Sequence, residues 1–148
     1  MTSTDTGLRR GELFNLLWTD VDFKKKELII EGTTSKTGQT RHVQLNSQAF
    51  SLLEDWHEQA KSDYVFSSPR TGRRFNNIKK SWEGLRKRAG LVDFRFHDLR
   101  HSFASKLVMA KVDLYTVKEL MGHSTIQMTE KYAHLAPEHK ASAVEKIV

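Results

Sequence analysis

The sequence predicts an α+β fold that is mostly helical and carries a small antiparallel sheet near the N-terminus. Apolar residues recur at helical spacing in several segments, and two short strand-like runs flank a polar stretch rich in turn-forming residues. A chain of 148 residues fits one domain that buries roughly two thirds of its unfolded surface. We therefore expect a single domain over residues 1–148 that needs no covalent staple.

The first third of the chain is expected to form one short buried helix and a β-hairpin. Leucines recur at helical spacing over about residues 12–18. The runs 28–30 and 41–45 have strand-like compositions, and residues 32–39 between them favour a turn. We expect a hairpin with Lys36 at or near its tip.

Two helices are expected in the middle of the chain. One begins at about Ser47 and places Phe50, Leu53 and Trp56 on one stripe. The other is a basic amphipathic helix that ends at Gly90. Its apolar stripe consists of Ile78, Trp82, Leu85 and Ala89.

The last third is expected to be helical over about residues 96–109, 112–121 and 125–132, with a tail helix after Pro137. Gly122 is expected to end one helix, and Ser124 or Thr125 can cap the next.

Composition excludes several classes of protein. The absence of cysteine excludes disulfides, thiol nucleophiles and zinc sites that use cysteine, and it fits a reducing compartment. No apolar run approaches the length of a membrane span, and the N-terminus lacks the apolar core of a signal peptide. We expect a cytoplasmic protein associated with the nucleoid.

Positive charge is concentrated in residues 70–100. This block carries 10 basic and 3 acidic side chains, an excess larger than the net charge of +6 of the whole chain. Such a block is typical of a surface that binds a polyanion, and the alternative is a solvated basic helix face. Its basic residues are Arg70, Arg73, Arg74, Lys79, Lys80, Arg86, Lys87, Arg88, Arg95 and Arg100.

Histidines and arginines supply the first candidates for chemistry. His97 and Arg100 are three residues apart and can point the same way from one helix. His97 and His101 have the spacing of helical zinc ligands, but the glutamate of the H-E-x-x-H pattern is missing. We expect no metal site and interpret His101 as a packed or hydrogen-bonded histidine.

Four further residues have both a structural and a chemical interpretation. Arg9 begins a helix, where an anion would offset its charge. Lys36 is either a solvated turn lysine or a proton donor that reaches over a bound backbone. His123 follows a helix break, and Tyr132 is either a half-buried tyrosine or a nucleophile.

Taken together, these residues suit phosphodiester chemistry better than metal or nucleotide chemistry. Two arginines can contact phosphate oxygens and neutralise charge at a pentacoordinate phosphorus without magnesium. The sequence contains neither a carboxylate cluster nor a glycine-rich phosphate loop. We expect no cofactor.

Several of these residues lie in stretches by which the chain resembles the tyrosine recombinases, or phage integrases. They follow the order of the family's motifs and span nearly the whole chain. The matching stretches are residues 6–13, 35–38, 97–104, 121–124 and 129–134.

The resemblance implies an enzyme of site-specific DNA recombination. Tyr132 would attack a DNA phosphate, form a 3′-phosphotyrosyl link and release a 5′-hydroxyl, so that neither ATP nor metal is needed. Arg9 and Arg100 would clamp the scissile phosphate, and Glu12 would help to fix the site.

The remaining roles follow from the same resemblance. His97 and His123 would donate hydrogen bonds or assist proton transfer, and Lys36 would act as the general acid for the leaving 5′-oxygen. The expected DNA contacts outside the catalytic set are Arg10, Arg70, Arg73, Arg74, Lys79 and Lys80.

Relatives imply expectations about partners and domains. They usually carry an upstream DNA-binding domain, and only residues 1–5 precede the first motif here, so we expect a catalytic domain with that domain absent. The expected partner is double-stranded DNA, with a homotetramer on DNA for a full-length protein and no membrane. The segment after Pro137 would dock on its own domain or on a neighbouring subunit.

Two alternatives stay open. A noncatalytic DNA-binding remnant of a mobile-element integrase would need arginine and lysine on phosphates but no poised tyrosine. An activity like that of type IB topoisomerases would use the same cleavage and rejoin the same strand.

Overall fold

The computed structural model describes residues 3–32, 38 and 40–136. The chain divides into two compact units, Met1–Phe103 and Ala104–Val148. The boundary falls within a helix, α5, whose first part belongs to the first unit. Each unit has buried apolar side chains of its own.

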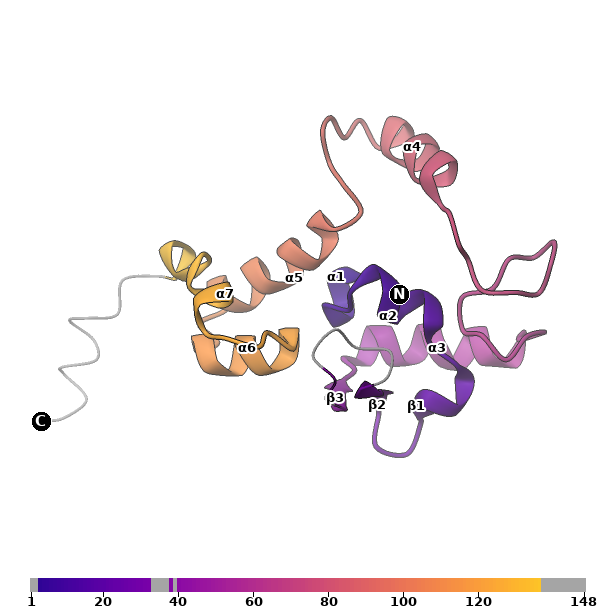
Figure 1. Cartoon of the computed structure of the whole chain (residues 1–148), viewed down its shortest axis with the longest axis horizontal. Helices are drawn as coiled ribbons and strands as arrows, with labels where there is room; N and C mark the ends of the chain where they lie inside the picture. Colours follow the sequence, from indigo (N-terminus) through magenta and orange to yellow (C-terminus); the bar gives the residue numbers. More distant parts are fainter. Residues whose placement is uncertain (1–2, 33–37, 39, 137–148) are drawn as a thin grey trace, which may run out of the picture. The chain divides into compact units, whose positions relative to one another are not determined.

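The first unit combines helices with a small sheet, as Figure 1 shows. In chain order its elements are α1 (Ser3–Thr6), α2 (Arg10–Asn15), the 3-10 turn η1 (Trp18–Asp20), β1 (Val21–Asp22), β2 (Glu27–Ile30), β3 (Arg41–Gln44), α3 (Ser47–Glu58), α4 (Lys79–Arg88) and the start of α5 (Asp98–Met109). The predicted α+β class, mostly helical with a small sheet near the N-terminus, is confirmed.

The sheet is antiparallel and has the strand order β1-β2-β3. β2 and β3 form the predicted hairpin, in which Leu28 pairs with Val43 and Ile30 pairs with Arg41. Side chains alternate between the faces of a strand, so Arg41, Val43 and Leu45 share one face of β3. Val43 and Leu45 are buried, which makes this face the inner one. The two-residue strand β1 was not predicted.

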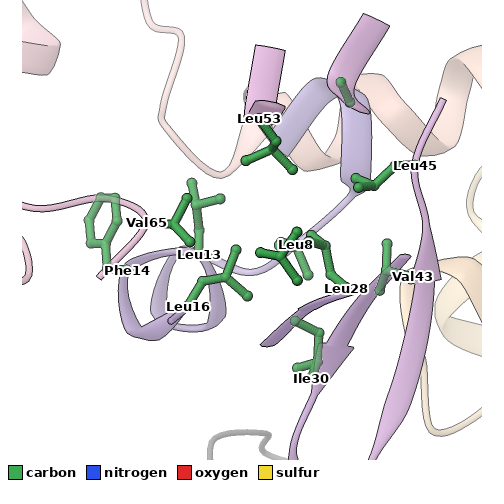
Figure 2. Close-up of a cluster of buried hydrophobic side chains, with 12 residues drawn as sticks. Leu8, Leu13, Phe14, Leu16, Leu28, Ile30, Val43, Leu45, Leu53 and Val65 are labelled. Carbon is green, nitrogen blue, oxygen red and sulfur yellow. The ribbon is translucent and has the colours of Figure 1, made fainter. Parts of the chain in front are cut away.

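The core of the first unit joins the sheet to α2 and α3. Figure 2 shows Leu8 at the middle of this cluster, with Leu13 on one side and Leu28 on the other. Leu53 of α3 and Val65 complete the cluster around them. Because Leu8 is fully buried, the segment that carries Gly7 and Arg9 is anchored by the core.

α3 begins at the predicted residue, where Asn46 caps it by accepting a hydrogen bond from the backbone of Ala49 at 2.8 Å. Its expected apolar stripe is only partly correct. Leu53 is buried and Phe50 is half-buried, but Trp56 is exposed. A spacing of three residues drifts around a helix of 3.6 residues per turn, so Trp56 leaves the buried face and donates to the Val65 carbonyl instead.

α4 is the predicted basic helix, and Gly90 follows its end with a left-handed backbone, φ 65°. Its apolar stripe packs less than expected. Trp82 contacts Phe94 and Phe96, whereas Leu85 is exposed, and no residue of α4 is buried. Phe96 also contacts Phe14 of α2, which ties the segment before α5 to the core of the first unit.

The second unit contains the end of α5, α6 (Leu114–Met121), α7 (Gln127–Glu130) and the 3-10 turn η3 (Ala133–Leu135). Its buried apolar residues are Ala104, Val108, Val117, Met121 and Tyr132. Asp113 caps α6 by accepting from the backbone of Thr116 at 2.9 Å. Gly122 ends α6 as predicted, with φ 59° and ψ 46°.

The helix predicted over residues 125–132 is wrong in extent. α7 covers only Gln127–Glu130, and its first cap position is Ile126 in a helical conformation, without a side-chain cap. Neither Ser124 nor Thr125 caps it, because the chain enters α7 through a turn that extends past both residues. Tyr132 lies beyond α7, between α7 and η3.

Two expectations lie outside the described residues. One is the position of Lys36 at the hairpin tip, and the other is a tail helix after Pro137 with its docking. Within the described part of the chain, no helix is long and apolar enough to cross a membrane.

Candidate functional site

Arg9 is held by the carboxylate of Glu12. The backbone N–H of Arg9 donates to Glu12 Oε2 at 2.8 Å, and the Arg9 guanidinium donates to Oε1 at 2.9 Å. The backbone contact is half of a capping box, in which the third residue of a helix reaches back to its cap. The start of α2 therefore fixes both the backbone and the side chain of Arg9.

A second arginine secures Glu12 from the sheet. The guanidinium of Arg41, in β3, donates to both carboxylate oxygens of Glu12 at 2.9 Å each. Glu12 is 3% exposed. Burial alone would raise the pKa of the Glu12 carboxyl, but the hydrogen bonds and charge of Arg41 and the hydrogen bonds of Arg9 outweigh it and lower this pKa to about 2. Glu12 is therefore a buried carboxylate that stays ionised at neutral pH.

Arg41 did not emerge as a candidate from the sequence. A signal was available, because Arg41 shares the inner face of its strand with Val43 and Leu45. An arginine at an inward strand position needs an anionic partner, since an unpaired buried charge is costly. The partner, Glu12, is 29 residues away in the sequence, so spacing alone does not identify it.

Arg100 is anchored to the same segment as Arg9. Its side chain is buried, with 3% of the residue exposed, and the guanidinium donates to the carbonyl oxygen of Gly7. Gly7 has φ 65°, a left-handed conformation that glycine adopts without the penalty other residues incur. The bond joins residues 93 positions apart. Its acceptor, Gly7, lies two residues before Arg9, so Arg100 is attached to the segment that carries Arg9.

His97 lies just before α5, not within a helix as predicted. Its carbonyl oxygen accepts a hydrogen bond from the backbone N–H of Arg100 at 3.0 Å, so His97 is joined to the first turn of α5. His97 is exposed, and its ring meets that of His101 edge to face with centroids 4.8 Å apart. Asp98 follows, and the backbone hydrogen bond from Arg95 is the main cause that lowers the pKa of its carboxyl.

His123 and Tyr132 belong to the second unit. The backbone N–H of His123 donates to the carbonyl of Lys118 at 3.0 Å and that of Gly122 to Glu119 at 2.9 Å, the pair of bonds that defines a Schellman motif. The His123 ring is buried, and its Nδ1 lies 2.8 Å from the hydroxyl of Thr129. The end of α6 fixes the backbone of His123, and the Thr129 side chain of α7 fixes its ring.

Tyr132 is 5% exposed, more deeply buried than the half-buried tyrosine of the structural interpretation. Its backbone N–H donates to the carbonyl of Thr129 at 2.9 Å, and its own carbonyl accepts from Leu135 at the same distance. The ammonium of Lys131 lies over the Tyr132 ring, 5.0 Å from its centroid. A turn, and not a continuous helix, therefore presents Tyr132.

The predicted DNA contacts are all exposed and all lie in the first unit. Arg70 and Arg73 sit in a turn closed by a bridge between Ser67 and Arg74. The side chain of Arg74 donates to Asn15. The full set is Arg10, Arg70, Arg73, Arg74, Lys79 and Lys80.

A pocket connects two members of this set. It has a volume of about 440 Å³, and Arg10 and Lys79 both line it. Its other lining residues are Asn76, Asn77, Ile78, Trp82 and Phe96. Basic, amide and aromatic side chains thus line one pocket.

The catalytic candidates therefore form one group in each unit, Arg9, His97 and Arg100 in the first and His123 and Tyr132 in the second. Lys36 lies outside the described residues. Among the residues that the structure describes, no group of three or more histidine or acidic side chains is arranged to hold a metal ion.

Comparison with known sequences matches the chain to one protein family. The profile of the phage integrase family matches residues 1–139. The integrase of Salmonella phage P22 is 35% identical over 153 residues, and the match covers 96% of this chain and 40% of that protein. The chain spans about half or less of the length of the first curated relatives that it matches.

The solved structures that resemble this chain include integrases as well. The catalytic domain of bacteriophage HP1 integrase has a TM-score of 0.70 and 32% identity, and the match covers 97% of this chain and 76% of that one. The integrase of transposon Tn1549, solved with circular intermediate DNA, has a TM-score of 0.83 at 22% identity, covering 99% of this chain and 57% of that one. This second likeness concerns the fold.

Proposed function

This chain belongs to the phage integrase family, and from that premise we propose that it cleaves and rejoins DNA strands in site-specific recombination. Residues 1–139, which the family profile matches, would form the catalytic domain. The proposed intermediate is a covalent 3′-phosphotyrosyl link between DNA and Tyr132.

One observation carries this proposal, the hydrogen bond from the Arg100 guanidinium to the carbonyl of Gly7. Through this bond, two arginines that are far apart in the sequence are anchored to one short segment, Gly7 to Arg9. Leu8, between Gly7 and Arg9, is fully buried, so the core anchors this segment. Two guanidinium groups held in place can donate hydrogen bonds to a phosphate and stabilise the negative charge that develops on it during the reaction.

The proposed reaction has two transfers that conserve the phosphodiester. The Tyr132 oxygen attacks phosphorus as its proton passes to solvent water, the bond from phosphorus to the 5′-oxygen breaks, and that oxygen leaves as a hydroxyl after taking a proton from Lys36. A 5′-hydroxyl of a partner strand then attacks the phosphotyrosine and gives its proton to Lys36, a phosphodiester is restored, and the Tyr132 oxygen leaves and takes a proton from water. No external energy source is required, because one ester replaces another in each step.

The other proposed roles concern the charge on the phosphate. Arg9 and Arg100 bind its nonbridging oxygens, and His97 and His123 donate hydrogen bonds to it. Glu12 acts indirectly, because it orients the guanidinium of Arg9 through the contact at 2.9 Å. Charge-assisted contacts of this kind are shorter and stronger than neutral ones, so the orientation of Arg9 matters.

The proposed DNA contact surface is the exposed basic set of the first unit. Arg10 and Lys79, which line one pocket, would bind backbone phosphates on either side of it. Arg70 and Arg73 would reach the duplex from their turn. Contacts of this type position a protein on DNA and make its affinity fall with salt.

We also propose that recombination takes place in a homotetramer on two DNA sites, and that the protein is associated with the nucleoid. Mass measurement of the complex on a duplex by light scattering tests the first point, with four copies as the expected result. A complex that contains one copy on each duplex under conditions of strand exchange would contradict it.

Covalent trapping tests the proposed chemistry. Duplexes of varied sequence that carry a nick near the cleavage point lose the short leaving strand, so a covalent adduct accumulates and survives a denaturing gel. We expect an adduct in buffer with EDTA, and none for Tyr132→Phe. Tyr115→Phe is the matched control, since Tyr115 is an exposed tyrosine of the same unit. An adduct that persists in Tyr132→Phe would exclude Tyr132 as the nucleophile.

A further inference from the structure

Thr129 links the two candidate residues of the second unit. Its hydroxyl lies 2.8 Å from Nδ1 of His123, and its backbone carbonyl accepts the N–H of Tyr132 at 2.9 Å. Thr129 is completely buried, and His123 is 7% exposed. One residue therefore contacts both the ring of the histidine and the backbone of the tyrosine.

The contact between Thr129 and His123 allows two arrangements of protons. In one, the threonine hydroxyl donates to Nδ1, and a neutral ring carries its proton on Nε2. In the other, Nδ1–H donates to the hydroxyl oxygen, and Nε2 of the neutral ring has only a lone pair. Only the first arrangement gives a neutral His123 that can donate a hydrogen bond from Nε2.

Burial of Thr129 selects between these arrangements. Among the described residues, Nδ1 of His123 is the sole hydrogen-bond partner of the Thr129 hydroxyl. If Nδ1 carried the proton, the hydroxyl hydrogen would lie in a fully buried position with no acceptor in the described part of the chain. A buried donor without an acceptor is destabilising, so the hydroxyl donates and Nδ1 accepts.

We propose that Thr129 is a positioning residue that keeps the proton of neutral His123 on Nε2, through its hydrogen bond to Nδ1. This proposal rests on the proposed function for the use of that proton, which is donation to a DNA phosphate. The backbone of His123 is already fixed by the Schellman motif at the end of α6. Thr129 adds the orientation and the tautomer of the ring, which the backbone does not determine.

Nitrogen NMR of the free protein tests the tautomer without DNA. Long-range ¹H–¹⁵N spectra distinguish a protonated from an unprotonated ring nitrogen at a pH where the ring is neutral. We expect a proton on Nε2 of His123 in the wild type and in Thr129→Ser, which keeps the hydroxyl. In Thr129→Val we expect signals of both tautomers. A wild-type ring with its proton on Nδ1, or a Val variant with an unchanged spectrum, would overturn the proposal.

Cleavage of nicked duplexes gives the second measurement. Thr129→Val is expected to lower the cleavage rate roughly tenfold with unchanged DNA affinity, since one neutral hydrogen bond is lost. Thr129→Ser should restore most of the rate. Thr125→Val is the matched control, because Thr125 is an exposed threonine just before α7. Equal rates for Thr129→Val and the control would overturn the positioning role.

The two measurements separate this inference from the proposed function. If the wild type does not cleave DNA, the proposed function fails, whereas the spectrum still decides the tautomer. Thermal unfolding of each variant shows whether it is folded. If Thr129→Val is unfolded, Thr129→Ser decides: a spectrum like that of the wild type supports the proposal, and a different spectrum contradicts it.

Discussion

Arg41 donates to both carboxylate oxygens of Glu12, with each nitrogen 2.9 Å from its oxygen. Glu12 in turn accepts two hydrogen bonds from Arg9. A strand residue thus acts through a buried carboxylate on an arginine that we assign to the phosphate. The ion pair links β3 to the start of α2 and makes the position of Arg9 depend on the sheet.

Replacement of Arg41 by methionine should destabilise the fold. The change leaves the Glu12 carboxylate buried without its bidentate partner, and breaking a buried pair lowers the free energy of unfolding by about 3 kcal/mol. Denaturation by urea measures this loss. Lys24→Met, at an exposed lysine, is the control and should change stability little. Similar stability of the two variants would show that the pair contributes nothing.

Acid should remove the stability that Glu12 provides. The pKa of its carboxyl is about 2 in the folded protein, against 4.5 as the ordinary value. Because the folded pKa is the lower one, the contribution is complete above about pH 4.5 and is lost as the pH falls toward about 2. The difference corresponds to about 3 kcal/mol.

Glu12→Gln removes this titration, so the variant should lose less unfolding free energy than the wild type between about pH 4.5 and about pH 2. Urea denaturation at a series of pH values measures both slopes. Glu58→Gln, at an exposed carboxyl on α3, should retain the wild-type slope. An unchanged slope in Glu12→Gln would contradict the lowered pKa.

Arg100→Lys should separate cleavage from binding. A lysine keeps the charge but lacks the planar fork of donors, so the cleavage rate should fall by about a hundredfold. DNA affinity, measured by fluorescence anisotropy in the Tyr132→Phe background, should change little. Arg88→Lys on α4 serves as the comparison for an exposed arginine. Equal losses of rate and affinity would remove the argument for a role in the transition state.

Lys79 and Lys80 should account for part of the salt dependence of DNA binding. The double change of both lysines to glutamine removes two proposed phosphate contacts, so the slope of log K against log salt should fall by about 2. Binding titrations at several salt concentrations measure the slope. Lys25→Gln, at an exposed lysine of the β1–β2 turn, should leave it unchanged. The same slope in the wild type, the double variant and Lys25→Gln would show that Lys79 and Lys80 do not contact DNA phosphates.

Local signals in the sequence predicted much of the fold. The predicted start of α3 at about Ser47 and the predicted end of α6 at Gly122 are both correct, and the structure adds Asn46 as the cap of α3. The hairpin follows from strand-like runs on either side of a turn. Local signals failed at α7, where the turn before Gln127 delays the helix and leaves Tyr132 beyond its end.

Contacts between distant segments escaped prediction. The pairing of Arg41 with Glu12 and the bond from Arg100 to Gly7 each join segments that are far apart in the sequence. The sequence identifies Arg9 and Arg100 as candidates by residue type and resemblance, but what anchors them is set by tertiary packing. The role of Thr129 is similar, because its hydroxyl has no distinguishing pattern until His123 is seen beside it.

The central claim is that Tyr132 forms the covalent bond to DNA, and the most direct test is to locate that bond. The trapped adduct is digested with protease and nuclease, and mass spectrometry identifies the peptide that retains a nucleotide. We predict that the nucleotide is attached to Tyr132 through its 3′-phosphate, and that the released strand carries a 5′-hydroxyl. A nucleotide on any other residue, or a link through a 5′-phosphate, would contradict the account.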